Sequence, residues 1–387
     1  MDKKYIILTC DGGSIRGLAS AVVLAELETR LNQKRKERGL PPREFYKDFN
    51  LLAGTSAGSI NVCGISSGIS PSKVRNLFID EGINIFPEAL TNLKLWLRRV
   101  RLGYSHPIFT DDFGDGRRGI NNVLQNVGDG VLNKSFDETM VKPTLVASYD
   151  MRNQQFIVFN NTVEAHKDIK TWEVIRSSSA APVALPAYLL SNSQFITAHK
   201  QQGYKVINDK GTECIPLVDG GLAANNPAMY AITYALSQGV KLENIVVASV
   251  GTGLNPPPGQ DDKKTALQLT RKDAIGWGIF EWISPLREVP ILRSLFDGSA
   301  DATDFQVRQL LKLGENYFRF QPKFKTNFQS FNANPDVLRN DEQNGMMNQT
   351  QEFLRNGVVF LDENQTKRIS VSALMDTLVE LILQEKG

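Results

Sequence analysis

The chain has 387 residues, 41% hydrophobic and 22% charged, and its 44 Lys and Arg residues nearly balance 42 Asp and Glu residues. These proportions exclude long disordered stretches, and the near-neutral balance argues against a dedicated nucleic-acid-binding protein. No apolar run reaches the roughly 18–20 residues that span a bilayer, so we expect no integral membrane protein. The first residues lack the pattern of a secretory leader. The three cysteines are widely spaced and outside any metal-ligand spacing, which suits a reducing, cytoplasmic setting.

The N-terminal part alternates apolar runs with helical patterns. Residues 5–9 predict a short strand, and a glycine-rich turn follows at Asp11. From Leu18 onward leucines recur at three- and four-residue steps, which predicts a helix that ends at Gly39. Residues 49–54 predict the next strand, which turns sharply into another helix. This alternation predicts an α/β fold, a three-layer sandwich around a mainly parallel central sheet.

The rest of the chain continues the pattern and ends in a helical part. Its last helix, at residues 370–385, has an apolar stripe that we expect to dock on the core. Residues 254–260 carry the strongest loop signal and would suit a linker. The remaining predicted strands lie at residues 143–148, 155–160, 205–208, 216–219 and 244–250, and the remaining helices at residues 72–81, 172–177, 227–237 and 305–312.

The turn after the second predicted strand reads Gly54-Thr55-Ser56-Ala57-Gly58, a G-x-S-x-G pattern. The pattern alone is weak, but here an apolar strand enters the turn and a helical pattern leaves it. Such a strand–turn–helix lifts the serine hydroxyl above the edge of a sheet, close to the amides of a helix N-terminus. Ser56 is therefore a candidate nucleophile, and Gly54 and Gly58 are the small residues that let the turn close.

A nucleophilic serine needs a base, and the chain has only three histidines. His106, His166 and His199 do not stand at the end of an apolar strand, and no histidine follows residue 199. In the α/β-hydrolase order the histidine follows both the serine and the acid. We therefore interpret all three as packing or surface residues and expect no Ser-His-Asp triad.

A carboxylate is the remaining candidate base. Asp219 ends an apolar run and precedes Gly220 and Gly221. An aspartate has a pKa of about 3.9 in water and is a poor base there, but burial raises its basicity. The two glycines leave room for a close approach to Ser56. A plain turn aspartate would fit Asp-Gly-Gly equally well, and it is the serine turn that favours the functional interpretation.

A third element, the turn from Asp11 to Gly17, can present backbone amides to an anion. Nucleotide motifs fail here, because Leu18 and Ala19 replace the Lys-Ser/Thr of a Walker A motif and Ser14 replaces the second glycine of a dinucleotide fingerprint. The amides of Gly12, Gly13 and Ser14 can instead form an oxyanion hole. This turn and the Ser56 turn both follow predicted parallel strands, so they share one edge of the sheet.

With these three elements in this order, the chain resembles the patatin-like phospholipases, a family of Ser-Asp dyad lipid acyl hydrolases. The resemblance covers about residues 5–325 and includes weaker similar stretches at residues 178–182, 225–227, 249–253 and 274–319. It implies that Ser56 is the nucleophile, Asp219 the proton acceptor, and Gly12, Gly13 and Ser14 the oxyanion hole. Arg16 and Gly17 would support that turn, as Gly54, Gly58, Gly220 and Gly221 support the other two. The family's third turn glycine is Ser14 here, a departure that strains the backbone if the position requires a positive φ.

The resemblance further implies a hydrolase of lipid degradation that uses no cofactor and no metal. We expect a phospholipase A-type serine esterase that releases fatty acids from membrane glycerolipids through an acyl-enzyme. An acyltransferase of the same fold, or a lipid-binding or regulatory protein with an impaired site, are the alternatives.

One segment offers a route to the membrane. Residues 93–102, from Leu93 to Leu102, place Trp96 on an apolar helical face and carry only positive charges. This combination suits an anionic lipid surface or a lid, although a helix packed on the core would show the same stripe. We expect a cytoplasmic protein with peripheral membrane contact, a catalytic core at residues 5–230, and a C-terminal part at residues 231–387 that completes and docks on it.

Overall fold

The computed structural model describes residues 3–85, 107, 109, 111–112, 118–256, 276–282, 290–328, 332–339, 345–362 and 364–386. The strands are β1 Tyr5–Cys10, β2 Leu51–Thr55, β3 Thr144–Asp150, β4 Gln155–Asn160, β5 Tyr188–Leu190, β6 Ile207–Asp209, β7 Thr212–Asp219, β8 Ile245–Val250, β9 Tyr317–Phe320, β10 Val358–Phe360 and β11 Arg368–Ser370. The helices are α1 Gly17–Glu37, α2 Ala57–Ser66, α3 Pro71–Ile85, α5 Ile120–Gly130, α6 Phe136–Thr139, α7 Glu164–Lys167, α8 Thr171–Ser178, α9 Ser193–Gln201, α10 Gly221–Ala224, α11 Ala228–Ser237, α13 Ile279–Trp282, α14 Pro290–Leu310, α15 Pro335–Arg339, α16 Met346–Asn356 and α17 Val371–Lys386.

The central sheet has the strand order β5-β7-β3-β2-β1-β8-β9, with β4 on β3 and β6 on β7. Its centre is parallel, because β1 pairs with β2 and β8, β2 with β3, and β8 with β9 in that sense. The β7 end is antiparallel, since β7 runs against β3, β5 and β6. The fold is therefore α/β around a mixed sheet of mostly parallel strands, as the alternation of strands and helices predicts.

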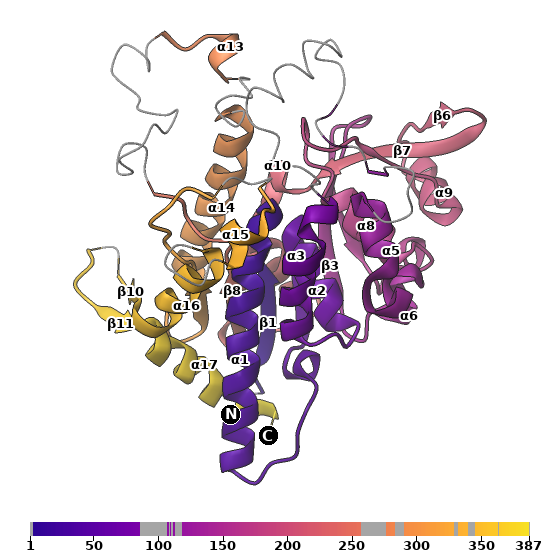
Figure 1. Cartoon of the computed structure of the whole chain (residues 1–387). Helices are drawn as coiled ribbons and strands as arrows, with labels where there is room; N and C mark the ends of the chain where they lie inside the picture. Colours follow the sequence, from indigo (N-terminus) through magenta and orange to yellow (C-terminus); the bar gives the residue numbers. More distant parts are fainter. Residues whose placement is uncertain are drawn as a thin grey trace.

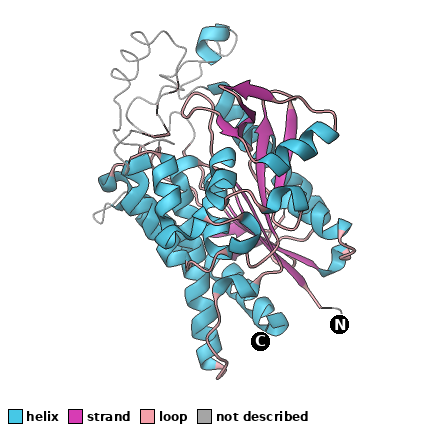
Figure 2. Ribbon diagram, turned by 90° about the vertical axis from the view of Figure 1, so that its right-hand side faces the viewer, coloured by secondary structure: helices cyan, strands magenta, loops and turns pink. Residues whose placement is uncertain are grey.

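Helices cover both faces of this sheet (Figures 1 and 2). Alternate residues of β1 point to opposite faces, as the two-residue period of a strand requires. Ile6 and Leu8 pack in the larger core with apolar residues of α1, α2, α3 and α17. Ile7 packs in the smaller core with α11 and with Val307 of α14. The three layers of the sequence-based expectation are thus helix, sheet and helix.

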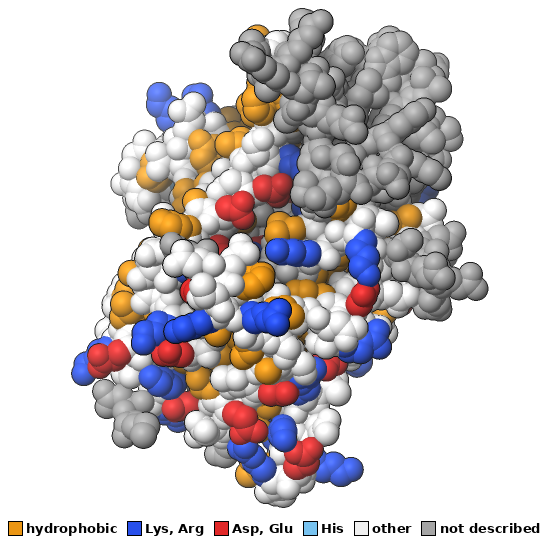
Figure 3. Space-filling model, turned by 90° about the vertical axis from the view of Figure 1, so that its left-hand side faces the viewer, with side chains coloured by type: hydrophobic (Ala, Val, Ile, Leu, Met, Phe, Trp, Pro, Cys, Tyr) orange, Lys and Arg blue, Asp and Glu red, His pale blue; other side chains and the backbone are white. Residues whose placement is uncertain are grey.

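The C-terminal residues belong to the same body as the N-terminal ones. Strands β8 and β9 extend the sheet beside β1, and α17 packs against α1. Residues near the two ends of the chain are in contact (Figure 1), since the Lys4 amide donates to the Glu385 carboxylate at 3.0 Å. On the face turned to the viewer in Figure 3, positive and negative side chains are interspersed with apolar ones.

Most predicted elements are present, with shifted ends. Residues 155–160 are a strand as predicted, whereas the helix predicted at residues 305–312 is α14, which begins at Pro290 and ends at Leu310. The short strands β5 and β9 were not predicted. No helix among the described residues is long and apolar enough to cross a membrane. Residues 93–102 and most of the loop at residues 254–260 lie outside the described residues, so membrane contact through the former stays a prediction.

Candidate active site

The G-x-S-x-G segment forms a sharp turn between strand β2 and helix α2. Ser56 occupies the turn with φ 53° and ψ −124°, a conformation that non-glycine residues rarely adopt. Gly58 permits the turn because a Cβ there would lie 2.0 Å from the Cys10 carbonyl oxygen. The Ser56 amide donates to Ser178 Oγ at 2.7 Å, which fixes the turn from the side of α8. The strand–turn–helix predicted from the sequence is confirmed.

The sheet brings Ser56 and Asp219 together through their common neighbour, strand β3. Thr55, at the end of β2, pairs with Ala147, and Asp219, at the end of β7, pairs with the next residue, Ser148. Strand β2 runs parallel to β3 and strand β7 runs antiparallel to it. The two strands therefore approach from opposite directions, on either side of β3, and end at neighbouring residues of β3. Ser56 Oγ consequently donates a hydrogen bond to Asp219 Oδ2 at 2.6 Å.

The surroundings of Asp219 favour a protonation change near neutral pH. The side chain is buried, with 2% of its surface exposed, and so is Ser56, with 5% exposed. Burial raises the pKa of Asp219 to about 7, while the hydrogen bonds from Ser56 Oγ and from the Gly221 amide lower it. The Gly221 amide donates to Asp219 Oδ1 at 2.8 Å, which orients the carboxylate. One oxygen of the Asp219 carboxylate thus accepts from the Ser56 hydroxyl, and the other accepts from the Gly221 amide.

The glycine-rich turn lies at the end of β1, next to the Ser56 turn, because Cys10 pairs with Gly54 in the parallel register of β1 and β2. The Gly12 amide donates to the Asn225 carbonyl at 3.0 Å, so it is already engaged. The amides of Gly13 and Ser14 have no acceptor among the described residues. Of the three amides expected to form an oxyanion hole, two are therefore available in this conformation.

Close contacts and backbone conformation favour glycine at several positions of this turn and of the other two motifs. A Cβ at Gly13 would lie 2.3 Å from Thr252 Oγ1, so only glycine fits there. Ser14 has φ 51°, which is the positive φ that the family glycine would adopt without strain. Arg16 Nη1 donates to the Gly253 carbonyl at 3.2 Å, which ties the turn to the loop after β8. The other motif glycines also face close neighbours, which would stand 2.2 to 2.8 Å from an added Cβ at Gly12, Gly17, Gly54, Gly220 and Gly221.

A buried ion pair holds the start of the glycine-rich turn. Asp11 accepts hydrogen bonds from both terminal nitrogens of Arg319, one of them at 2.9 Å. Arg319 stands on β9, and its Nη1 also donates to Ser249 Oγ at 2.9 Å. Both ionic side chains are almost fully buried. The position of the turn thus depends on a residue 308 positions away in the chain.

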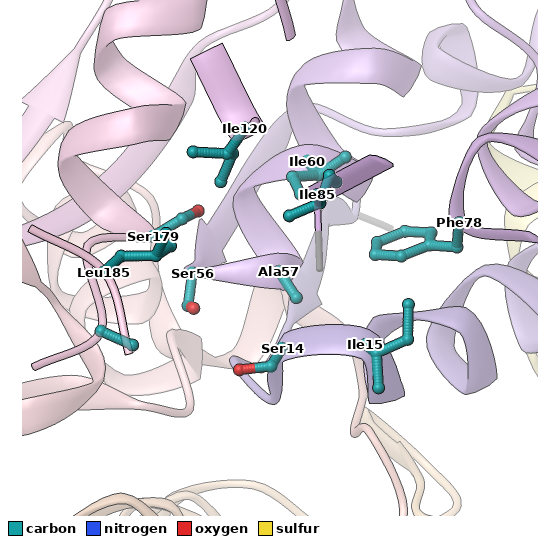
Figure 4. Close-up of a pocket in the computed structure, with 11 residues that line it drawn as sticks. Ser14, Ile15, Ser56, Ala57, Ile60, Phe78, Ile85, Ile120, Ser179 and Leu185 are labelled. Atoms are coloured by element: carbon teal, nitrogen blue, oxygen red, sulfur yellow. The ribbon is translucent and has the colours of Figure 1, made fainter. Parts of the chain in front are cut away.

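A pocket opens beside Ser56 (Figure 4). Ser14, Ser56 and Ser179 are its hydroxyl-bearing lining residues. The rest of its wall is apolar and comes mainly from the turn, α2, α3 and the ends of α5 and α8: Ile15, Ala57, Ile60, Phe78, Ile85, Ile120, Ala181 and Leu185. A wall of this kind accommodates an aliphatic chain whose polar end stays near Ser56.

The histidines that the structure describes are engaged elsewhere. His199 is buried, and its Nε2 lies 3.0 Å from Asp150 Oδ2. His166 Nδ1 accepts from the Asn160 amide at 3.1 Å, and burial lowers the pKa of this imidazole to about 4. His106 lies outside the described residues. Asp219 is the side chain to which Ser56 Oγ donates.

Four residues that the sequence did not single out position the site. Ser178, Asn225, Thr252 and Arg319 bind the amide of Ser56, the Gly12 peptide, or Asp11. Their sequence stretches resemble the family, but nothing in their spacing relates them to Ser56. Asn225 is an example, because it contacts Gly12 twice across a long separation in sequence. Its backbone carbonyl accepts from the Gly12 amide, and its Nδ2 donates to the Gly12 carbonyl.

Comparison with known proteins identifies the family of this chain. The Patatin-like phospholipase family model matches residues 8–232, more than half of the chain, so the chain belongs to the patatin-like phospholipase family. Membership in this family supports lipid acyl hydrolase activity in general.

Individual relatives are distant but extend over most of the chain. Patatin-like protein 2 of Arabidopsis thaliana is 27% identical, over 81% of this chain and 75% of that protein. Patatin-like protein 2 of Oryza sativa subsp. indica is 27% identical, over 82% of this chain and 76% of that protein. A protein of Solanum tuberosum named probable inactive patatin-3-Kuras 1 is 22% identical, over 81% of this chain and 78% of that protein. Among solved structures, VipD from Legionella pneumophila aligns with 100% of this chain and 67% of its own, at 11% identity and a TM-score of 0.35.

Proposed function

We propose that the protein is a phospholipase A-type serine esterase, which releases fatty acids from membrane glycerolipids through an acyl-enzyme on Ser56. The observation that carries the proposal is the buried hydrogen bond of 2.6 Å from Ser56 Oγ to Asp219 Oδ2. A serine hydroxyl is a weak nucleophile unless an adjacent base accepts its proton. Asp219 is the base, and its pKa of about 7 suits proton transfer near neutral pH.

In the first step, Asp219 takes the proton of Ser56 while Oγ attacks the ester carbonyl carbon. The carbonyl oxygen becomes an oxyanion and accepts hydrogen bonds from the amides of Gly13 and Ser14. One such donor contributes about 3–4 kcal/mol to the stabilisation of the transition state. The tetrahedral intermediate then expels the alcohol, which takes the proton from Asp219, and the acyl group stays on Ser56.

In the second step, water replaces the alcohol. Asp219 accepts a proton from the water as its oxygen attacks the acyl-enzyme, and the proton then returns to Ser56 Oγ as the fatty acid leaves. Because Asp219 passes each proton on to the oxygen that leaves, one carboxylate serves both steps. The apolar wall with Ile60, Phe78 and Ile120 holds the acyl chain. The proposal includes the cytoplasmic setting and the peripheral membrane contact predicted from the sequence.

The experiment is the release of fatty acids from a panel of phospholipids and galactolipids, with Ser56→Ala as the control. The expected result is release by the wild-type protein and none by Ser56→Ala at equal thermal stability. Equal release by both proteins would contradict the proposal. A wild-type protein that binds these lipids without cleaving them would identify an impaired site, and transfer of the acyl group to an added alcohol in place of water would identify an acyltransferase.

A further inference from the structure

Ser179 carries a hydroxyl that the proposed mechanism leaves unused. The residue lines the pocket next to Ser56 (Figure 4), and it is buried, with 7% of its surface exposed. Its Oγ is buried and has no hydrogen-bond partner among the described residues. A buried hydroxyl without a partner loses its hydration without compensation, which destabilises the folded protein. Such a group in a pocket wall points to an acceptor that arrives with a ligand.

The two preceding serines differ from Ser179. Ser177 Oγ donates to the Glu173 carbonyl at 2.7 Å within α8. Ser178 Oγ accepts the Ser56 amide at 2.7 Å. Both hydroxyls therefore have protein partners, and both residues are fully buried. Of these three consecutive serines, Ser179 is the one whose hydroxyl lacks a partner and that lines the pocket.

The chemistry of the pocket defines the acceptor. Apart from Ser14 and Ser56, the other residues that line the pocket, among them Ile120, Ala181 and Leu185, have apolar side chains. An acyl chain offers no acceptor along its methylene groups, whereas the ester group at its end has two oxygens. Because the ester must reach Ser56 to react, its oxygens are the acceptors that come close to Ser179.

We propose that Ser179 is a further substrate-binding residue, whose hydroxyl donates a hydrogen bond to an oxygen of the bound ester. The inference rests on the proposed function, because it takes the substrate to be an acyl ester placed at Ser56. Ser179 takes part in no proton transfer. Its hydroxyl binds and orients the ester beside the Ser56–Asp219 pair.

Ser179→Ala separates this role from a structural one. Because the Ser179 hydroxyl has no protein partner, its removal should leave the thermal midpoint unchanged or raise it. Its removal should also lower kcat/KM for 4-methylumbelliferyl heptanoate about 3- to 10-fold, the range of one neutral hydrogen bond. Ser179→Thr, which keeps a hydroxyl, should retain more activity than Ser179→Ala. Ser177→Ala is the matched control, because it loses a bond within α8 and should lower the thermal midpoint with little change in kcat/KM.

A binding measurement distinguishes failure of this inference from failure of the proposed function. Ser56→Ala should bind the same ester without cleaving it, and calorimetry should find about 3- to 10-fold tighter binding than to Ser56→Ala/Ser179→Ala. If the wild-type protein cleaves no ester but this difference in affinity is found, the proposed function fails and the role of Ser179 stands. The inference is overturned if Ser179→Ala changes neither kcat/KM nor affinity, or if it lowers activity only together with the thermal midpoint.

Discussion

Ser56 and Asp219 stand at the facing ends of two strands that are paired with consecutive residues of a third. Ala147 of β3 pairs with the residue before Ser56, and Ser148 pairs with Asp219 itself. The contact between hydroxyl and carboxylate is therefore set by backbone hydrogen bonds of the sheet and does not depend on a mobile loop. Placement of this kind is favourable for catalysis, because little motion is needed to reach the reactive geometry.

Replacement of Asp219 by Asn should abolish the activity and leave the fold intact. Asn is similar in shape and can still accept a hydrogen bond from Ser56, but it cannot take a proton. Loss of a general base costs about 10²- to 10⁴-fold in rate. Fatty-acid release and reaction of Ser56 with a fluorophosphonate probe should both fall by this order, and circular dichroism should be unchanged. Full labelling of Asp219→Asn at the wild-type rate would contradict the role of Asp219.

The rate should depend on pH through the same carboxyl group. Because the pKa of Asp219 is raised to about 7, the proposed base is mostly protonated, and so unable to accept a proton, below that value. We expect kcat/KM for a soluble ester to rise with pH and to level off above an apparent pKa near 7. A flat profile between pH 5 and 8 would show that Asp219 is ionised throughout, with a pKa close to that of an ordinary aspartate.

The stability of the protein should depend on pH in the opposite direction. The pKa of Asp219 is higher in the folded state than the ordinary value of 3.8, so the folded protein binds more protons than the unfolded chain between the two values. The free energy of unfolding should therefore fall as pH rises from about 4 to about 7, by up to about 4 kcal/mol from this group. Urea unfolding of the wild-type protein and Asp219→Asn should show the variant gaining relative stability across this window. A constant difference between the two proteins would contradict the prediction.

Removal of Arg319 should damage both the fold and the site. Arg319→Met leaves the Asp11 carboxylate buried without its partner. Breaking a buried ion pair in this way lowers the free energy of unfolding by about 3–5 kcal/mol. The surviving activity should show a lower kcat, because Asp11 begins the turn whose amides we propose to bind the oxyanion. Arg339→Met is the control, since Arg339 and its partner Asp80 are both exposed, and exposed pairs contribute about 0–1 kcal/mol. Similar losses in the two variants, measured by urea unfolding, would contradict the importance of the Asp11 pair.

Replacement of Ser14 by Gly should stabilise the protein. Ser14 has φ 51°, and a left-handed backbone costs a residue with a Cβ about 1–2 kcal/mol, part of which is offset by the greater freedom of glycine in the unfolded chain. The amide is kept, so fatty-acid release should change little. Lys210, in an exposed turn with φ 49°, is the matched control, and Lys210→Gly should gain stability similarly with no effect on activity. A loss of stability in Ser14→Gly would show that the serine side chain contributes more than its strained backbone costs.

The residues of the site could be predicted where their signal is local. The strand–turn–helix at Ser56 follows from an apolar run, two glycines and a helical pattern within about twenty residues. The scarcity of histidine favours a carboxylate as the base, and in the structure the Asp219 carboxylate accepts a hydrogen bond from Ser56. Such local patterns also predict most strands and helices, because periodicity of apolar residues determines them.

The remaining features depend on pairing between distant segments. The antiparallel course of β7 could not be predicted, since Thr212–Asp219 would show the same apolar run in either direction. Strand β9 has only four residues, Tyr317–Phe320, and is too short to show a period. The ion pair of Asp11 with Arg319 could not be predicted either, because the residues next to Arg319 in the sequence do not indicate a role in the glycine-rich turn. The Gly12 amide is likewise engaged by a distant segment, because it donates to the backbone carbonyl of Asn225, and the Gly13 amide does not.

The ion pair of Asp11 and Arg319 joins residues 308 positions apart, so it can form only late in the synthesis of the chain. A ribosome that has completed residues 8–232, the segment matched by the family model, has already made Ser56, Asp219 and the glycine-rich turn. It has not yet made β8, which lies beside β1, or the arginine that neutralises Asp11. The nascent chain thus carries Ser56, Asp219 and the strands that pair them before it carries the residues that hold the start of the glycine-rich turn. Synthesis of the last part of the sheet is therefore the step that completes the support of this turn.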